Sequence, residues 1–195
     1  RNVERIFLTR YFTSDQHFGH TNIIGYCNRP FTTTEEMDAA MIANWNSIVE
    51  DEDEVYTLGD FTCNGGLKRI TELCEQLRGI KHLIRGNHDR HNPREFIKAG
   101  FASCSQNLVL ETCIGIPSLL CLRHKPIREP EKRTHPHWIV NGHVHNHWTV
   151  RRDIKHINVG VDVFAFKPIT ERRLVNIIER AEEASFHESM VKDIA

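Results

Sequence analysis

The stretch Lys81-His82-Leu83-Ile84-Arg85-Gly86-Asn87-His88-Asp89 decides how this chain is interpreted. Residues 81–84 predict a short strand, which ends at a glycine followed by an amide, an imidazole and a carboxylate. Glycine lets the backbone bend freely, and the next three residues offer a neutral oxygen ligand, a proton donor and an orienting carboxylate. A plain Asn-His turn is the alternative interpretation. Because four such residues in succession are rare, the motif favours a functional site.

Four other polar motifs also follow predicted strands. Taken alone, each is most often a turn or an ordinary strand end. Ligand sites in layered α/β folds gather beyond the carboxyl ends of strands, so we expect these distant residues to converge at one edge of a sheet. In the first motif, alternate positions of an extended segment would point both ligands to the same side. The motifs are Asp15-Gln16-His17 after Ile6–Thr13, Gly59-Asp60 after Glu54–Leu58, His124 after Ser118–Leu122, and Gly142-His143-Val144-His145 after Trp138–Val140.

Helical periodicity separates these strands. Thr33-Thr34-Glu35-Glu36 is a start signal of the capping-box type. Apolar stripes then predict two buried helix faces, one at Met37, Met41, Trp45 and Ile48 and one at Leu67, Ile70, Leu73 and Leu77. The other expected elements are a helix from Asn92-Pro93 to near Gly100, a β pair of Leu108–Glu111 with Ser118–Leu122, a strand Ile157–Val163 and a helix Glu171–Ala184. Without a linker or repeat, the chain is predicted to be one α/β domain over residues 1–195.

The formal net charge of the 195 residues is −1, and no basic tail or stripe indicates nucleic acid, although a nucleic-acid substrate stays open. The 13 histidines are the compositional anomaly, and their meaning depends on motif context. We expect four of them, His82, His91, His156 and His187, in surface loops.

The six cysteines form no C-x-x-C pair, so we expect small buried hydrophobic residues in a reducing compartment, the cytoplasm. Neither a signal-peptide core nor an apolar run of about 18 residues is found, which predicts no membrane partner.

Together the five motifs resemble those of the calcineurin-like metallophosphoesterase family, which reads D-x-H, G-D, G-N-H-[DE], H and G-H-x-H in this order. The resemblance covers Tyr11 to about Pro168 and is nearest to short single-domain phosphoesterases of bacteria and their phages. The resemblance to the short phosphoesterases rests on five segments: His17-Phe18-Gly19-His20, Asn22-Ile23-Ile24, Tyr26-Cys27-Asn28-Arg29-Pro30-Phe31, Asn44-Trp45-Asn46 and Asn158-Val159-Gly160-Val161-Asp162.

The resemblance implies a four-layer α-β-β-α sandwich of two mixed sheets flanked by helices, with a dimetal site at the strand carboxyl ends. One metal would be held by Asp15, His17, Asp60 and His145, and the other by Asp60, Asn87, His124 and His143. Asp60 would bridge. His88 would face the substrate as the catalytic acid, with Asp89 behind it to fix its tautomer. Mixed nitrogen and oxygen ligands admit Mn, Fe, Zn, Co or Ni, and the family favours Mn²⁺.

The expected function is hydrolysis of a phosphoester by a metal-bridging hydroxide, and specifically that of a phosphodiesterase acting on a nucleotide or another small phosphodiester. A phosphomonoesterase and a non-catalytic scaffold are the alternatives. Protein phosphatases of the family continue the Gly-Asp pair differently, purple acid phosphatases have Tyr where Cys63 stands, and the repair nucleases need a further capping domain. Arg29 is expected on the surface or against a substrate phosphate, and His20 and Asn22 in a turn or lining the pocket.

Overall fold

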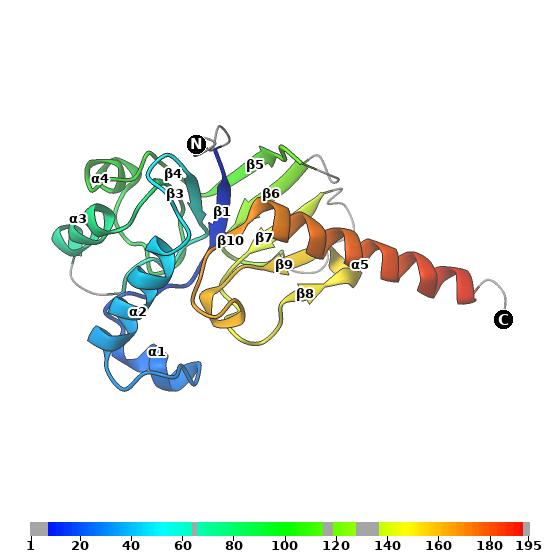
Figure 1. The fold of residues 1–195 in the computed structure, drawn as a ribbon, viewed down its shortest axis with the longest axis horizontal. Helices are drawn as coiled ribbons and strands as arrows, with labels where there is room; N and C mark the ends of the chain where they lie inside the picture. The colour runs from blue at the N-terminus through cyan, green and yellow to red at the C-terminus, as the bar shows by residue number, and fades with distance from the viewer. Residues whose placement is uncertain (1–7, 64–65, 115–118, 128–136, 193–195) are drawn as a thin grey trace, which may run out of the picture.

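Two mixed β-sheets form the centre of the molecule, as Figure 1 shows. The computed structural model describes residues 8–63, 66–114, 119–127 and 137–192, with side chains up to residue 184. The first sheet has the order β10-β1-β2-β3-β4, in which β1 to β4 are parallel and β10 is antiparallel to β1. Its strands are β1 Arg10–Thr13, β2 Glu54–Thr57, β3 Ile80–Ile84, β4 Ser103–Ser105 and β10 Ile169–Thr170.

The second sheet has the order β5-β6-β7-β9-β8, with parallel strands in the middle and an antiparallel strand at each edge. Its strands are β5 Asn107–Glu111, β6 Leu119–Arg123, β7 Trp138–Asn141, β8 Val150–Arg151 and β9 His156–Asn158. A parallel bridge between Ser14 and Gly160 joins the two sheets just beyond the ends of β1 and β9. The carboxyl ends of strands from both sheets therefore meet.

Five α-helices surround these sheets within the described residues. They are α1 Thr21–Tyr26, α2 Thr34–Asn46, α3 Gly66–Gln76, α4 Pro93–Lys98 and α5 Glu171–Lys192, with short 3₁₀ turns η2 Arg152–Ile154 and η3 Val161–Val163. In α2 the Thr33 side chain accepts from the Glu36 amide, but the Glu36 carboxylate accepts from Thr32 rather than Thr33. The complete capping box lies at α4, where Asn92 and Glu95 cap each other.

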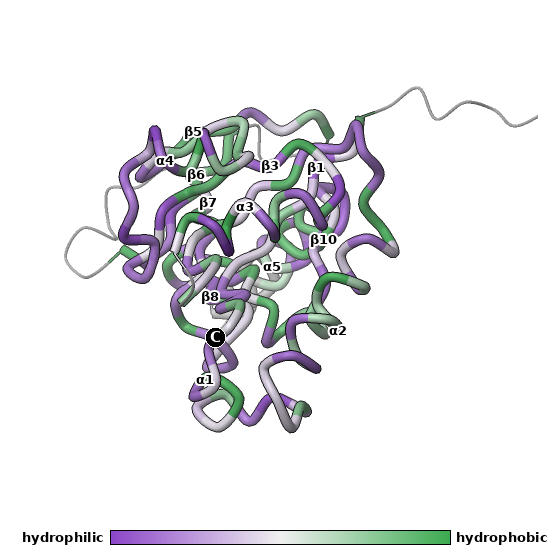
Figure 2. The backbone as a smooth tube through the Cα atoms, turned by 90° about the vertical axis from the view of Figure 1, so that its left-hand side faces the viewer, coloured by the Kyte–Doolittle hydropathy of each residue, from purple (hydrophilic) through white to green (hydrophobic). Residues whose placement is uncertain are grey.

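Alternation along the first sheet divides the core into two. Tyr11, Val55 and Leu83 pack with α1 to α4 on one face, including the predicted stripe from Met37 to Trp45, which is buried. Phe12, Tyr56 and Ile84 on the other face pack against the second sheet and α5. Figure 2 shows the hydrophobic character of β6, which contributes to this second cluster.

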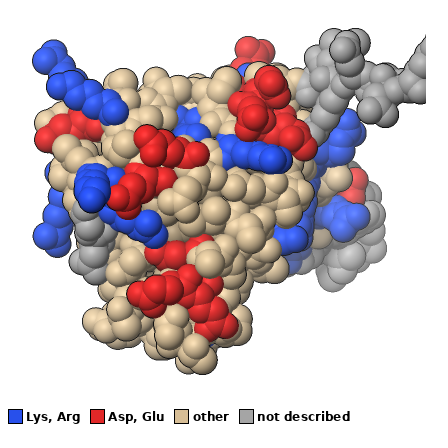
Figure 3. Space-filling model, turned by 60° about the vertical axis from the view of Figure 1, so that its left-hand side comes forward, with Lys and Arg blue, Asp and Glu red and all other residues tan. Residues whose placement is uncertain are grey.

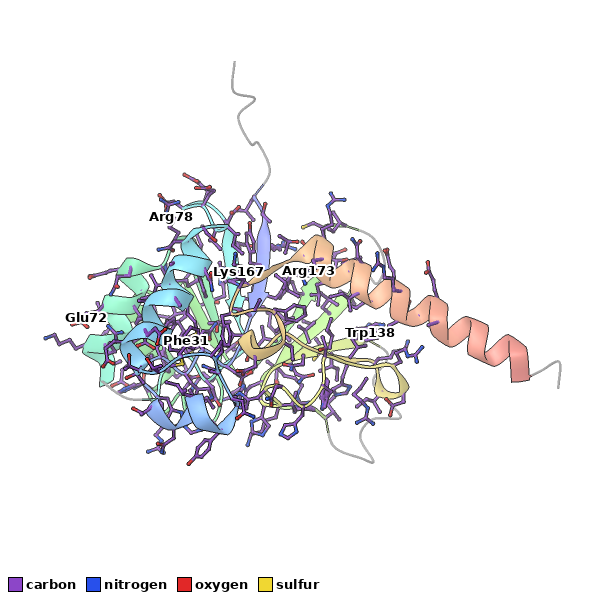
Figure 4. The ribbon with its side chains drawn as sticks, turned by 60° about the horizontal axis from the view of Figure 1, so that its bottom comes forward. Phe31, Glu72, Arg78, Trp138, Lys167 and Arg173 are labelled. Atoms are coloured by element: carbon purple, nitrogen blue, oxygen red, sulfur yellow. The ribbon has the colours of Figure 1, made fainter. Side chains whose placement is uncertain are left out.

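Helix α5 runs along the sheets and extends past them toward the C-terminus (Figure 1). Figure 4 labels Trp138 of β7 near this helix, and its indole nitrogen donates to Glu182 at 2.8 Å. No helix within the described ranges has the length and apolar character needed to cross a bilayer.

Several expectations need correction. The strand predicted over Ile157–Val163 ends at Asn158, after which the chain forms η3. His156 is not in a surface loop: it is 1% exposed, and its Nε2 accepts from the Ile127 amide. His82 and His91 are half-buried, and the side chain of His187 and residue Ser118 lie outside the described residues.

All six cysteines are free in the structure. Cys27, Cys74 and Cys121 are buried as expected, whereas Cys113 is exposed. We therefore expect thiol titration of the unfolded, unreduced protein to count six free thiols. A count of two or four would contradict the free state of these side chains.

Candidate metal centre

The predicted site residues converge where the two sheets meet, as the strand-end rule predicts. Asp15 and His17 follow β1, and Asp60 follows β2. His124 follows β6, and His143 and His145 follow β7. Their side chains form two groups within which the ligand atoms lie no more than 4.8 Å apart: Asp15, His17 and His145 in one, and Asp60, His124 and His143 in the other.

Asn87 joins the second group from the end of β3. Its Oδ1 lies 3.1 Å from Nε2 of His124, and the other ring nitrogen of His124 is held at 2.7 Å by the Leu58 carbonyl. That carbonyl accepts from Nδ1–H, so Nε2 is the ring nitrogen that faces the centre of the group and would bind a metal there after losing its proton.

Asp60 lies between the two groups. Its Oδ2 is 3.5 Å from Nε2 of His17 in the first group and 3.4 Å from Nε2 of His124 in the second. Its Oδ1 accepts a hydrogen bond from the His88 amide at 2.9 Å. One carboxylate oxygen thus faces both groups while the other is anchored to the backbone.

The backbone of the site is unusual. Asp15, His17, Asp60, His143 and His145 all have φ between 48° and 70°, so five of the seven predicted ligands adopt the left-handed region. This corrects the expectation that Asp15 and His17 alternate along extended backbone. Left-handed non-glycine residues cost on the order of 1 kcal/mol or more each and cluster at functional sites.

Two glycines allow the loops to approach closely. A Cβ atom at Gly86 would overlap the side chain and amide of Asp60, and one at Gly142 would overlap the side chains of Ser14 and Asp15. The glycines of these two motifs are therefore required by contact with the carboxylates of the site.

We expect Gly86→Ala to lower the free energy of unfolding by about 1–3 kcal/mol, because the added methyl group must displace Asp60. Gly25→Ala in α1 is the matched control, since no atom lies within 4 Å of its Cβ position. Urea denaturation measures both variants. If Gly86→Ala were as stable as Gly25→Ala, the site would accommodate a methyl group beside Asp60, which would contradict the prediction.

Burial shapes the protonation of the first group. It raises the pKa of Asp15 to about 6 and lowers the pKa of His17 to about 3. Burial also opposes a charge on His145, but its hydrogen bond to Asp162 raises the pKa of His145 to about 10. His17 is therefore a neutral imidazole at neutral pH, which is the form that binds a metal.

The second group follows the same logic. Burial, together with the charge of His124, lowers the pKa of His143 to about 4. Burial opposes ionisation of Asp60, yet the hydrogen bond from His124 holds the pKa of this carboxyl below its ordinary value. The charges of His124 and Asp60 thus stabilise each other.

The residues fit divalent metals. Nε2 of His17 is buried and makes no hydrogen bond, although it faces Asp60. A buried imidazole nitrogen without a partner is costly unless something else binds it. Imidazole, carboxylate and amide oxygen donors suit Mn, Fe, Zn, Co or Ni. Two thiols lie beside the ligand residues. The Cys63 sulfur is within 4.8 Å of ligand atoms of His17 and His20, and the Cys27 sulfur is equally near those of His145 and Asp162.

Asp89 does not have the role expected for it. Its Oδ2 accepts from the amides of Asp60 and Gly86 at 2.8 and 2.7 Å, and its Oδ1 accepts from the Phe61 amide at 3.1 Å. Among the described residues these bonds engage both oxygens, and none joins His88. The buried carboxylate instead fastens the Gly59-Asp60 loop to the loop that carries Asn87 and His88.

His88 lies beside the first group. Its ring centroid is 5.1 Å from that of His17, and its Nδ1 is 3.8 Å from the Cys63 sulfur. His20 is also drawn into the cluster, with Nδ1 at 3.3 Å from Nδ1 of His17, whereas Asn22 is exposed on α1. Half-buried imidazoles thus border the ligand cluster.

Arg29 and Asp162 are residues of the candidate site that the sequence motifs did not place there. Arg29 is 4% exposed rather than on the surface, and it forms a two-pronged ion pair with Asp162. The same guanidinium donates to the carbonyls of Asp15 and Gln16. Asp162 then accepts from Nδ1 of His145 at 2.9 Å, which orients that ring. In the sequence, the indication for these two residues was that each lies in a segment that resembles the short bacterial and phage phosphoesterases.

Comparisons with known proteins agree with the fold. The chain is 36% identical over 181 residues to the uncharacterized protein MJ1445 of Methanocaldococcus jannaschii, covering 88% of this chain and 92% of that protein. It is 27% identical over 180 residues to the Gene 66 protein of Mycobacterium phage L5, covering 79% and 86% respectively. The crystal structure of the protein of unknown function AQ665 from Aquifex aeolicus matches with a TM-score of 0.68 and 26% identity, over 88% of this chain and 100% of that one. No protein-family model matches. The chain belongs to the family of MJ1445.

Proposed function

We propose that this protein is a dimetal phosphoester hydrolase, and specifically a phosphodiesterase acting on a nucleotide or another small phosphodiester. The observation that carries the proposal is that two groups of imidazole and carboxylate ligands share Oδ2 of Asp60. Such a shared oxygen suits two ions about 3.5–4 Å apart. The helix–sheet–sheet–helix layering is part of the proposal, with α5 as the outer helix of the second sheet.

The charges suit a phosphate ester. Two divalent ions would supply four positive charges and acidify a bound water, while Asp15 and Asp60 supply two negative charges. The cluster would then attract the anionic ester and stabilise charge that develops on its oxygens. Mn²⁺ is the favoured ion.

The residues of the chain have distinct tasks in this proposal. The imidazoles, once deprotonated, and Asn87 would present lone pairs to the ions, and Arg29 with Asp162 keeps His145 oriented. His88 borders the cluster, and a protonated imidazole there can donate a proton to the departing oxygen. Asp89 holds the two loops that carry Asp60 and His88. The unpaired thiols support a cytoplasmic location, which we include in the proposal.

Turnover of bis-p-nitrophenyl phosphate against p-nitrophenyl phosphate, with Mn²⁺ added, tests the function. We expect the diester to be cleaved and EDTA to abolish the reaction. Turnover of the monoester alone would identify a phosphomonoesterase. Metal binding without turnover of either compound would identify a scaffold.

A further inference from the structure

A cavity of about 340 Å³ opens beside the second ligand group. Asn87 and His124 form one side of it, so the cavity is continuous with the candidate metal centre. Its other lining residues are Arg85, Gly86, Gln106, Asn107, Arg123 and Lys125. The volume lies within the range of about 300–1,000 Å³ for small-molecule sites. Of the described residues, three cations and no carboxylate line this space.

The three cations come from two strand ends. Arg85 follows β3 and is steadied by donating from Nε and one terminal nitrogen to the Asp89 carbonyl at 3.3 and 3.0 Å. Arg123 ends β6, and its buried Nε has no hydrogen-bond partner. Lys125 is exposed. Within the described part of the chain, no ion pair is found for any of the three.

Two carboxylates of the adjoining loops make their contacts away from these cations. Asp89 accepts from three backbone amides, and Asp60 faces the imidazoles of His17 and His124. Among the described residues, no carboxylate is therefore paired with a cation of the cavity. A planar guanidinium with a free Nε donor is suited to a phosphate oxygen.

We infer that this cavity binds a second phosphoryl group of the substrate, beyond the one that is cleaved. The inference rests on the proposed function, because it places the scissile phosphate at Asn87 and His124. The substrate class is then a small molecule with two phosphates, such as a nucleoside polyphosphate or a phosphorylated diester.

A nucleic-acid strand fits these observations less well. The formal net charge is −1, and the face drawn in Figure 3 has Lys and Arg interspersed with Asp and Glu rather than gathered into a stripe. Binding of a long strand usually needs such a basic track. The concentrated charge lies in the cavity, which suits a small ligand.

Calorimetry with two phosphonates that cannot be hydrolysed tests the inference. Methylphosphonate represents one phosphate, and methylenediphosphonate represents two. We expect the Mn²⁺-loaded protein to bind the bisphosphonate at least about 10-fold more tightly. Arg123→Gln and Lys125→Gln should each lose most of that gain while changing methylphosphonate affinity less than about 2-fold.

Lys98→Gln is the charge-matched control, since Lys98 is exposed on α4 and outside the cavity. It should bind both phosphonates as the parent protein does. Metal content is measured before and after each titration, because bisphosphonates also bind free Mn²⁺. Thermal melts verify that Arg123→Gln is folded. Because Lys125 is exposed, Lys125→Gln tests the cavity without disturbing the packing of the fold.

Equal losses for both phosphonates, or no loss for either, would overturn the inference. So would oligonucleotide binding that strengthens with strand length and depends equally on Arg123. Metal-free protein separates this inference from the proposed function. If the loaded protein fails to bind methylphosphonate but the metal-free protein binds the bisphosphonate through Arg123, the phosphate cavity stands and the dimetal proposal fails.

Discussion

Asp60→Asn is expected to remove both metals together and reduce phosphodiester turnover to background. Asp60 is assigned to both ligand groups because its Oδ2 faces His17 and His124 at nearly equal distances. The substitution removes the negative charge that both ions would share. It also cannot be accommodated by rotating the amide. In one orientation the NH₂ group takes the place of Oδ2 and points its hydrogens at the ions. In the other it takes the place of Oδ1 and meets the His88 amide, which is itself a donor.

Asp53→Asn is the matched control for this substitution. Asp53 is a buried carboxylate just before β2, whereas Asp60 follows the same strand. Asp53 accepts hydrogen bonds from the amides of Thr9 and Glu50. It should lower the melting temperature but leave metal content and turnover intact. Elemental analysis by mass spectrometry gives the number of bound ions. Two ions retained by Asp60→Asn with activity intact would contradict the bridging assignment.

The positions of the candidate ligands could be predicted from the sequence because one physical rule governs them. Parallel strands of one sheet place their carboxyl ends at the same edge, which brings together the motifs after β1, β2 and β3 and, separately, those after β6 and β7. The two sets meet because the sheets join beyond the ends of β1 and β9. The buried stripes of α2 and α3 were predictable in the same way, since a period of 3.6 residues fixes which side chains face the core.

The conformation of the site could not be predicted so well. An Asp-x-His segment has no local signal for the left-handed backbone found at Asp15 and His17. That conformation depends on distant partners, such as the Asp60 carbonyl that accepts from the His17 amide and the Arg29 guanidinium that binds two carbonyls of the motif. Contacts of this kind exist only after the chain has folded.

Asp89 illustrates a second limit of sequence reasoning. Its place after His88 suggested a carboxylate that orients the imidazole, but its oxygens are taken by amides of the Gly59-Asp60-Phe61 segment and Gly86. Adjacent residues in a turn commonly point in different directions. Short elements such as β8 and β10 were also missed, because two residues carry no measurable periodicity.

His88→Gln is expected to keep both metals and to lose on the order of 10²–10⁴-fold in turnover of a diester with a ribose leaving group. His88 lies beside His17 but belongs to neither proposed ligand set, and its amide donates to Oδ1 of Asp60. Its proposed task is to protonate the leaving oxygen. That task matters most for an alkoxide and least for p-nitrophenolate, which departs without a proton, so the nitrophenyl diester should lose distinctly less.

The comparison of the two esters separates the possible roles of His88, because glutamine keeps a hydrogen-bond donor but cannot transfer a proton. His91→Gln is the matched control: this half-buried imidazole lies three residues further along, near Glu95, and should change neither substrate. Equal losses on both esters would make His88 a group that stabilises charge or positions the substrate. A fall in metal content would instead make it a ligand, as its proximity to His17 and Asp60 allows, and the division between ligands and acid would then have to be redrawn.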